Sequence, residues 1–434
     1  MKKILLFIFF VLIVFAGFIF AEDTDFYQED TVFYQDGSTV KGMHLTALTM
    51  GSQFFKDKID DLVDNTELNA VVIDVKEIDG KIAIKGVAGD LAYSKSLPDP
   101  MVYVRKLKER NVYIIARLVC FRDNTMPRKR PELGVKTSNG QLWEDYKKLT
   151  WLDPYNQKAR NYLLDLAETV ADMGFDEIQF DYIRFPSDGN VKECRYKVER
   201  TSTTASQAIV DFLKQAKQRL APKGIKISID VFGLTTTATT DMGIGQKIVE
   251  MTEQVDYVCP MVYPSHYRKG DYGIPHPNKE PYRTVYIALQ GAKKRIPASK
   301  LRPWLQDFSI RGVKYGPEEV QAQIQACFDC DVTTWLLWNP ACKYTKGGLK
   351  TKDKADTYVK SSTQTINKLL KLDAVKKSTT TKTNVNKLNT NKQNASKATV
   401  NKANGTKTNK VNKSSNSYTS DLNKANAIKA KNKK

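Results

Sequence analysis

The sequence predicts an α/β fold of the (β/α)8 TIM-barrel type, followed by a disordered, lysine-rich C-terminal tail. Eight short runs rich in β-branched and aromatic residues recur over about 330 of the 434 residues. Amphipathic helical patterns separate these runs. The long connections all follow predicted strands, on the face where barrels build their sites. Together these observations favour a barrel with insertions.

The predicted strands have lengths and compositions typical of buried β-structure. They are Lys41–Thr46, Asn69–Lys76, Asn111–Leu118, Glu177–Arg184, Ile225–Val231, Asp256–Tyr263, Leu301–Phe308 and Thr333–Asn339. The helical patterns between them include Gln157–Met173, Ser206–Leu220, Gly245–Gln254 and Glu318–Phe328, and we expect a last helix near Lys354–Leu370 to close the ring.

Connection lengths favour a barrel over a doubly wound open sheet. The helix-to-strand turns are short and contain glycine, whereas Phe121–Thr150, Phe185–Arg200 and Pro264–Glu280 are long connections after strands. An open sheet would need a Gly-rich phosphate-binding loop after its first strand. The segment Met43–Gly51 lacks such a loop. The barrel is therefore the better interpretation.

The N-terminus has the pattern of a targeting segment. Lys2 and Lys3 precede an uncharged apolar run from Ile4 to Ala21, so we interpret residues 1–21 as a cleaved signal peptide or a retained membrane anchor. Residues 22–39 are acidic and polar and are interpreted as a linker to a barrel domain at residues 40–371. Either interpretation of the leader takes the barrel out of the cytoplasm.

The C-terminal tail, residues 372–434, differs in composition from the barrel. Residues 371–434 contain 16 lysines, no arginine and two acids, and lysine recurs every five residues from 377 to 407. Such a segment buries too little apolar surface to offset the entropy of ordering, so we predict disorder. Lysine without arginine or interleaved aromatic residues favours contact with an anionic cell-wall polymer or membrane surface, and argues against specific nucleic-acid binding.

The sequence predicts no metal site and no cofactor. Cys327 and Cys330 have metal-type spacing, but no second CxxC or histidine pair accompanies them. A structural zinc site needs four ligands, so ordinary helix thiols are the better interpretation.

Polar side chains gather where the predicted strands end. Within Gly174–Pro186, Ile178, Phe180 and Tyr182 share one parity, and Gln179 and Asp181 share the other. The apolar face of this strand should pack on helices while Asp181 faces the barrel mouth, which is where barrel enzymes keep their chemistry.

Alternation along the other strands selects further residues at the same mouth. Carboxylates beside aromatic rings, with no cofactor motif, indicate carbohydrate chemistry, because glycoside hydrolysis needs an acid and a second carboxylate. We predict Asp181, Asp230 and Asp307 as catalytic, and His44, Asp74, Arg117, Arg184, Tyr263, His266, Trp304, Trp338 and Asn339 as substrate-binding. Any one of these residues could also serve the structure alone.

Several motifs in one order along the chain strengthen this interpretation. They are Trp151–Asn156, Gly174–Pro186, Asp230–Gly233, Asp256–His266, Arg302–Asp307 and Leu337–Asn339. From about Lys41 to Tyr344 the sequence resembles a family of exported bacterial proteins that are predicted glycoside hydrolases, distantly similar to the α-amylase superfamily. The resemblance implies a TIM barrel and a glycosidase.

The resemblance also bears on the catalytic roles. The nucleophile of the amylase-like pattern, an Asp that ends the fourth strand, corresponds to Asp181. The acid of that pattern is a Glu on the fifth strand, where this chain has Asp230. This departure leaves Asp230, Asp307 and Glu77 as alternative acids.

These observations lead to one main hypothesis and two alternatives. The main hypothesis is an extracytoplasmic bacterial glycoside hydrolase, associated with the membrane or cell wall, that acts as a monomer on a cell-wall or extracellular polysaccharide. The first alternative is a non-catalytic glycan-binding protein on the same scaffold. The second makes polyanion contact by the tail the main function.

Overall fold

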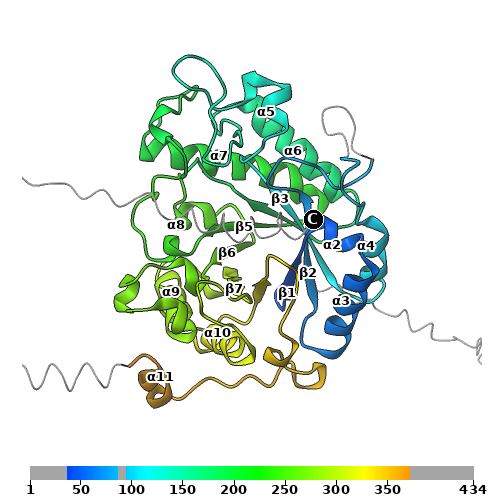
Figure 1. Ribbon diagram of the computed structural model, residues 1–434, viewed down its shortest axis with the longest axis vertical. Coiled ribbons are helices and arrows are strands. Elements are labelled where there is room, and N and C mark those ends of the chain that lie inside the picture. The colour runs from blue at the N-terminus through cyan, green and yellow to red at the C-terminus, as the bar shows by residue number, and fades with distance from the viewer. Residues whose placement is uncertain (1–36, 87–93, 372–434) are drawn as a thin grey trace, which may run out of the picture. The chain divides into compact units, whose positions relative to one another are not determined.

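Eight parallel strands pair in chain order and close into a barrel in the computed structural model of this protein, which describes residues 37–86 and 94–371 (Figure 1). Pairing of the first strand with both the second and the last closes the ring. The strands are β1 (Lys41–Leu45), β2 (Ala70–Lys76), β3 (Tyr113–Val119), β4 (Glu177–Asp181), β5 (Lys226–Phe232), β6 (Tyr257–Met261), β7 (Trp304–Gln306) and β8 (Trp335–Trp338). The predicted barrel is confirmed. The predicted leader and the predicted disordered tail lie outside the described residues.

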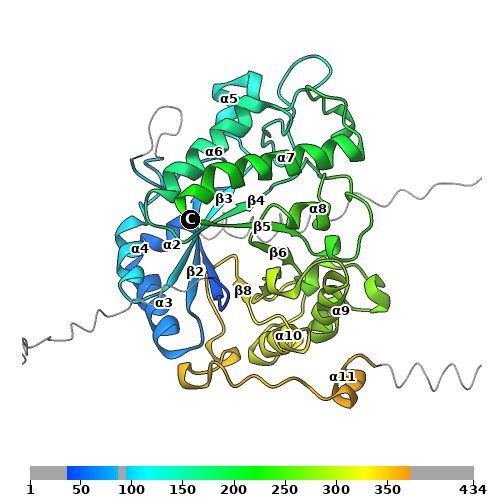
Figure 2. The ribbon, with the colours of Figure 1, turned by 180° about the vertical axis from the view of Figure 1, so that it is seen from behind.

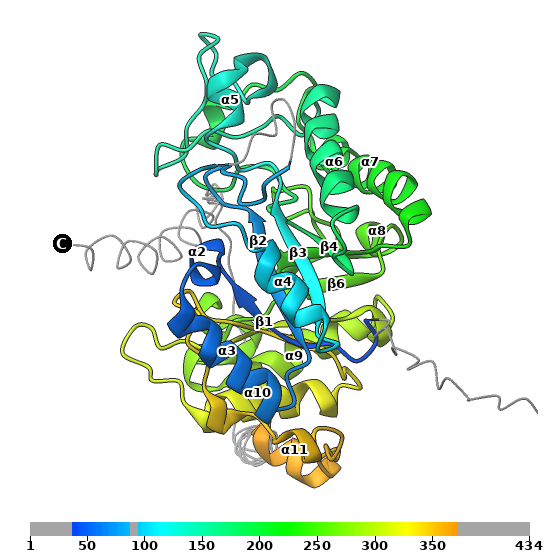
Figure 3. The ribbon, with the colours of Figure 1, turned by 90° about the vertical axis from the view of Figure 1, so that its right-hand side faces the viewer.

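Helices surround the barrel on its outer side, as Figures 1 and 2 show. The α-helices are α2 (Ala47–Met50), α3 (Gln53–Asn65), α4 (Met101–Lys108), α5 (Met126–Lys129), α6 (Gln157–Ala171), α7 (Ser202–Leu220), α8 (Ile248–Thr252), α9 (Pro281–Lys293), α10 (Pro317–Asp329) and α11 (Thr363–Leu369). The long helices α6 and α7 lie side by side (Figure 3). Within the part of the chain that the structure describes, no helix is both long and apolar enough to cross a bilayer.

Several predicted elements are shorter in the structure than expected, among them the fourth strand and the last helix. The fourth strand stops at Asp181 because Tyr182 has a φ of 49°, a left-handed conformation that turns the chain out of the sheet. The predicted helix at Lys354–Leu370 is wrong in its first half. There the chain is not helical and follows α10, with Tyr358 stacked on Phe328 at 4.0 Å between ring centroids. Hydrogen bonds to α10 also hold this segment, because Gln325 Nε2 donates to the Val359 carbonyl at 2.9 Å and the Ser361 N–H donates to Asp329 at 2.6 Å.

Alternating side chains separate the inside of the barrel from its outside. Met43, Ile178 and Phe180 belong to the large apolar cluster between strands and helices. Val72 and Ile115 belong to a smaller cluster inside the barrel. The inside is tightly filled, because a Cβ atom on Gly42 would lie 2.7 Å from Leu336 Cδ2. Period-two alternation therefore holds as predicted.

The N-terminal end of the barrel is closed by a buried ion pair. Both oxygens of Glu177 accept hydrogen bonds from Arg302 Nη1 at 2.8 Å, and Tyr113 donates to the same carboxylate at 3.0 Å. Arg302 Nη2 donates to the carbonyl of Gly37 at 2.9 Å. Gly37 and Thr39, which the sequence places in the linker, thus contact the barrel.

Candidate active site

A cavity of about 290 Å³ opens at the C-terminal ends of the strands, opposite the closed end. Its lining combines charged side chains with aromatic rings. The lining residues are His44, Thr46, Asp74, Glu77, Ile78, Arg117, Arg122, Lys147, Leu149, Asp181, Tyr182, Arg184, Asp230, Phe232, Met261, Tyr263, Trp304, Trp338 and Pro340.

The long connections after β3 and β4 build one wall of this cavity. They are held together where Lys136 and Arg195 exchange backbone hydrogen bonds of 3.1 and 2.7 Å. The first connection supplies Arg122 and Lys147 to the wall, and the second supplies Arg184. The prediction that long connections elaborate this face is confirmed for these two loops.

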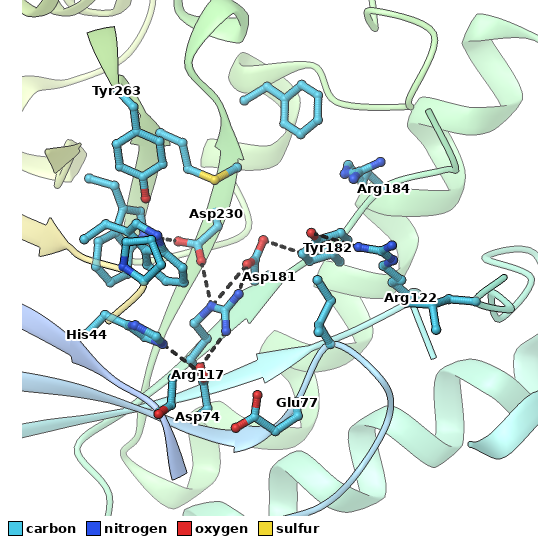
Figure 4. A pocket seen from close by; sticks show the side chains of 18 of the residues that line it. His44, Asp74, Glu77, Arg117, Arg122, Asp181, Tyr182, Arg184, Asp230 and Tyr263 are labelled. Carbon is cyan, nitrogen blue, oxygen red and sulfur yellow. Dashed lines mark hydrogen bonds and ion pairs between the residues drawn. The ribbon is translucent and has the colours of Figure 1, made fainter. Parts of the chain in front are cut away.

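Arg117 on β3 lies at the centre of the cavity floor, between carboxylates from three other strands (Figure 4). Its Nη1 donates to Asp74 at 2.5 Å, and its Nε donates to Asp181 at 3.1 Å. Its Nη2 also donates to Asp181. Its Nε lies 3.7 Å from an oxygen of Asp230. One guanidinium group therefore forms ion pairs with three strand-end carboxylates and holds two of them by hydrogen bonds.

His44 on β1 extends this network on one side. Its Nε2 lies 2.9 Å from Asp74 Oδ2, and its ring stacks on Trp338 with 4.0 Å between centroids. Burial alone would lower the pKa of His44, but the adjacent Asp74 carboxylate outweighs burial and raises the pKa to about 9. Burial alone would raise the pKa of Asp74, but His44 and Arg117 outweigh burial and lower this pKa to about 2. The pair therefore carries both charges at neutral pH.

Asp181 and Asp230 sit in different surroundings although they meet the same arginine. Asp181 Oδ1 accepts a hydrogen bond of 2.6 Å from the backbone N–H of Tyr182, so both of its oxygens have donors. Asp230 accepts 2.7 Å from Trp304 Nε1. Burial, and then the charge of Asp181, raise the pKa of Asp230 well above its usual range. Burial and the neighbouring charge thus favour the neutral form of Asp230 more than in an ordinary aspartate.

Glu77, just after β2, is a third carboxylate on the cavity wall. Glu77 is only half-buried, whereas Asp230 is fully buried. The carboxylate of Glu77 makes no hydrogen bond or ion pair with the described part of the chain. Burial, and then repulsion from Asp74, raise its pKa to about 7. A group with this pKa exchanges its proton near neutral pH, as a general acid must.

The structure brings together most of the residues predicted for the site. His44, Asp74, Arg117, Asp181, Arg184, Asp230, Tyr263, Trp304 and Trp338 all line the cavity. Figure 4 shows the hydroxyl group of Tyr263 directed toward Asp230. Glu77, an alternative acid, also lines the cavity.

Three predicted residues lie outside the cavity lining. Asp307 accepts hydrogen bonds from the Thr345 N–H at 2.8 Å and from its hydroxyl at 2.6 Å, so it holds the loop after β8. Asn339 donates to the carbonyl groups of Asp307 and Lys343 in the same loop. His266 packs its ring against Tyr263 at 5.1 Å. The structure gives these three residues supporting positions, and Asp307 is not placed to act as the acid.

The cationic and apolar residues of the loop wall were not predicted from the sequence. Arg122, Lys147 and Leu149 come from the connection after β3, and Tyr182 follows β4 directly. The length of that connection was the only available signal, because loop residues have no periodicity.

The cysteine pair behaves as ordinary core thiols. Cys327 and Cys330 are both buried, and Cys330 accepts a hydrogen bond from Gln290. Within residues 37–86 and 94–371, no group of three His, Cys, Asp or Glu side chains is arranged to hold a metal ion.

Comparisons with known proteins agree with this geometry. A family model described as "Putative glycosyl hydrolase domain" matches residues 42–344. A search of curated proteins finds no match.

Solved structures provide three further comparisons. A hypothetical protein from Ruminiclostridium thermocellum ATCC 27405 is 36% identical, with 44% of this chain and 97% of that chain covered and a TM-score of 0.39. The PgaB (BpsB) glycoside hydrolase domain from Bordetella bronchiseptica is 11% identical, with 72% and 99% covered and a TM-score of 0.54, and thus shares the fold. A noncanonic maltogenic α-amylase, AmyB, from Thermotoga neapolitana is 13% identical, with 70% and 68% covered and a TM-score of 0.42.

Proposed function

The chain belongs to the glycosyl hydrolase family whose model matches it, and from this premise we propose that it is an exported hydrolase that cleaves the O-glycosyl bonds of a cell-wall or extracellular polysaccharide. The observation that carries the proposal is one cavity with carboxylates in distinct protonation environments. Glycoside hydrolysis needs this division, because one carboxyl group must donate a proton while another stays charged.

Asp181 is the charged partner in the proposed mechanism. It ends β4, and Arg117 and the Tyr182 N–H fix its two oxygens. A carboxylate held in this way stabilises or attacks the anomeric carbon as positive charge develops there.

Glu77 is the proposed general acid. Its pKa of about 7 and its half-buried position allow it to protonate the leaving oxygen and to regain the proton from water. Asp230 is almost fully buried and accepts a hydrogen bond from Trp304, so it has a supporting role beside Asp181 in this mechanism.

Replacing Asp181 with Asn tests the proposal. The change keeps the side-chain size and removes the charge, so the release of new reducing ends from a panel of polysaccharides should fall by about a thousandfold or more. The melting temperature should stay close to that of the wild type. Asp307→Asn is the matched control: it alters an acid at a strand end outside the cavity and should leave turnover within about twofold. Unchanged turnover in Asp181→Asn would remove this residue from the mechanism.

A non-catalytic glycan-binding protein is the second candidate. It is favoured by the complete hydrogen bonding of Asp181, whose oxygens already have donors from Arg117 and Tyr182. If the wild type binds an oligosaccharide from the panel but releases no reducing ends from any polymer, this candidate replaces the hydrolase.

Export and attachment to an anionic surface complete the proposal and rest on the ends of the chain. Sixteen lysines against two acids in residues 371–434 should hold the protein to an anionic wall polymer or to phospholipid, and salt should weaken this attraction. Removal of residues 372–434 should leave the rate on soluble substrate unchanged and reduce retention on isolated cell walls. Salt-independent retention, or equal retention by the shortened chain, would contradict the tether.

A further inference from the structure

The outer wall of the cavity carries more positive than negative charge. Three cations, Arg122, Lys147 and Arg184, project into the cavity from the loops after β3 and β4. Figure 4 shows the side chains of Arg122 and Arg184 on the side of the cavity away from His44. The three cations differ in how well the protein neutralises them, and that difference identifies which of them can take a ligand.

Arg122 is neutralised within the protein. Its Nε and Nη2 donate to Asp145 Oδ2 at 3.0 and 2.7 Å. The other oxygen of Asp145 accepts from the backbone N–H groups of Lys147 and Leu149 at 2.8 and 3.1 Å. This buried pair therefore shapes the loop and leaves little charge for a ligand.

Arg184 is held in place but has no ion-pair partner. Its Nη1 donates to the Phe185 carbonyl and to Ser187 Oγ, each at 3.0 Å. Its guanidinium group lies 4.8 Å from the ring centroids of both Tyr182 and Phe232. No carboxylate oxygen among the described residues comes within 4.0 Å of it, and its Nε and Nη2 donate to no protein group there.

Lys147 is likewise without an acidic partner. Its ammonium group makes no hydrogen bond or ion pair in the described ranges, although its side chain is half-buried. Burial, and then the neighbouring Arg122, lower the pKa of Lys147, and burial lowers the pKa of Arg184. The buried Asp188 attracts Arg184 electrostatically but lies beyond ion-pair distance from it. Burial also raises the pKa of Asp188. Both cations are thus poorly compensated until an anion arrives.

We infer that Arg184 and Lys147 bind an anionic substituent of the glycan, so that the substrate is an acidic polysaccharide bearing a carboxylate or a phosphate group. This inference rests on the proposed function. Arg184 presents two unused N–H donors in the planar arrangement that fits a carboxylate or phosphate, and Lys147 adds a point charge. Because Arg184 and Asp181 line the same cavity, the anion lies on the sugar at the cleavage position or next to it.

The tail supports the same class of substrate independently. Its 16 lysines suit an anionic polymer, so the cavity and the tail would both bind the same acidic polysaccharide. A neutral polysaccharide would leave both features without a ligand.

Matched ligand pairs test the inference by binding, which does not require cleavage. The full chain is titrated by calorimetry at physiological salt with short uronic-acid oligomers and their methyl esters, and with phosphate-bearing glycan oligomers and their dephosphorylated forms. The wild type should bind at least one acidic form about tenfold or more tightly than its neutral counterpart. The pair that shows the preference distinguishes a carboxylate from a phosphate.

Variants assign the preference to the cavity. Lys147→Gln should lose most of the preference, and Arg184→Lys, which keeps the charge but not the planar donors, should lose part of it. Lys148→Gln is the matched control, because it removes the same charge from the adjacent exposed residue outside the cavity lining. Equal binding of acidic and neutral forms by the wild type, or equal loss in Lys147→Gln and Lys148→Gln, would overturn the inference. Acid-selective binding that depends on Lys147 without any cleavage would retain the inference and refute the proposed hydrolase.

Discussion

The two ends of the barrel each bury an arginine against carboxylates, but they differ in the balance of charge. At the N-terminal end, Arg302 meets one carboxylate, Glu177, and both side chains are fully buried. At the C-terminal end, Arg117 meets Asp74, Asp181 and Asp230 around an open cavity.

This difference in balance has a direct consequence for protons. Arg302 and Glu177 neutralise each other, and Tyr113 and Gly37 use further hydrogen-bonding groups of the pair. On the cavity floor around Arg117 and His44 the acids outnumber the cations, so repulsion adds to burial and the pKa values of Asp230 and Glu77 rise. The balanced Arg302–Glu177 pair stabilises the structure. The excess of acids beside the cavity raises carboxyl pKa values, which general acid catalysis requires.

The comparison teaches that a buried arginine–carboxylate contact does not by itself identify a functional site. The identifying features are unequal numbers of opposite charges and access to a cavity. Substitutions at either end should therefore have separable effects, on activity at one end and on stability at the other.

The largest expected effect is on catalysis at the open end. Glu77→Gln should lower turnover of natural glycan by about 10²- to 10⁴-fold and affect activated aryl glycosides much less, because good leaving groups need no proton. The acid must be protonated, so wild-type activity should fall as the pH rises through about 7. Initial rates on both substrates from pH 5 to pH 9 measure this. If Asp230→Asn shows the leaving-group dependence while Glu77→Gln behaves like the wild type, Asp230 is the acid.

The next effect is on stability at the closed end. Glu177→Gln keeps the side-chain volume but leaves Arg302 without its counter-ion, so the free energy of unfolding should fall by about 3–5 kcal/mol. Denaturant unfolding measures the loss, and the folded fraction should keep its specific activity. Glu168→Gln is the control, because it removes a half-buried partner of Arg219 that stays accessible to solvent, and it should cost at most about 1 kcal/mol. Equal losses in both variants would remove the distinction between the buried pair and a surface pair.

The sequence was sufficient to predict the fold and the floor of the site. Strand alternation places Gln179 and Asp181 inside the barrel and Ile178 and Phe180 outside. It extends correctly to His44, Asp74, Arg117 and Asp230. This prediction works because side-chain direction in a strand depends only on position along the strand.

The same rule fails where a strand ends. β7 stops at Gln306, and the side chain of Asp307 turns to Thr345, 38 residues away, so its parity no longer indicates the barrel mouth. Arg122 and Lys147 were missed for a related reason. Contacts such as the Arg122–Asp145 pair and the bridge from Arg122 to Trp151 determine their loop, and no local pattern encodes these contacts.

The smallest of the predicted effects concerns the His44–Asp74 ion pair at the open, C-terminal end of the barrel. Asp74→Asn should lower the pKa of His44 from about 9 to below its ordinary value of 6.5, because burial remains after the opposing carboxylate is removed. A histidine with a raised pKa stabilises the fold below its unfolded pKa, and this stabilisation is lost as the pH rises through the folded pKa. The depressed pKa of Asp74 stabilises the fold above the usual aspartate value, and this contribution is lost as the pH falls toward 2.

The wild type should therefore exceed Asp74→Asn in unfolding free energy by on the order of 3 kcal/mol between about pH 4 and pH 6.5. This advantage should shrink toward pH 9. Histidine NMR titration and denaturant unfolding at pH 5.5 and pH 9 test the two parts separately, and the signal of the exposed His276 should not respond to the substitution. A His44 signal that titrates at the same pH in both proteins would show that Asp74 does not set the charge of His44.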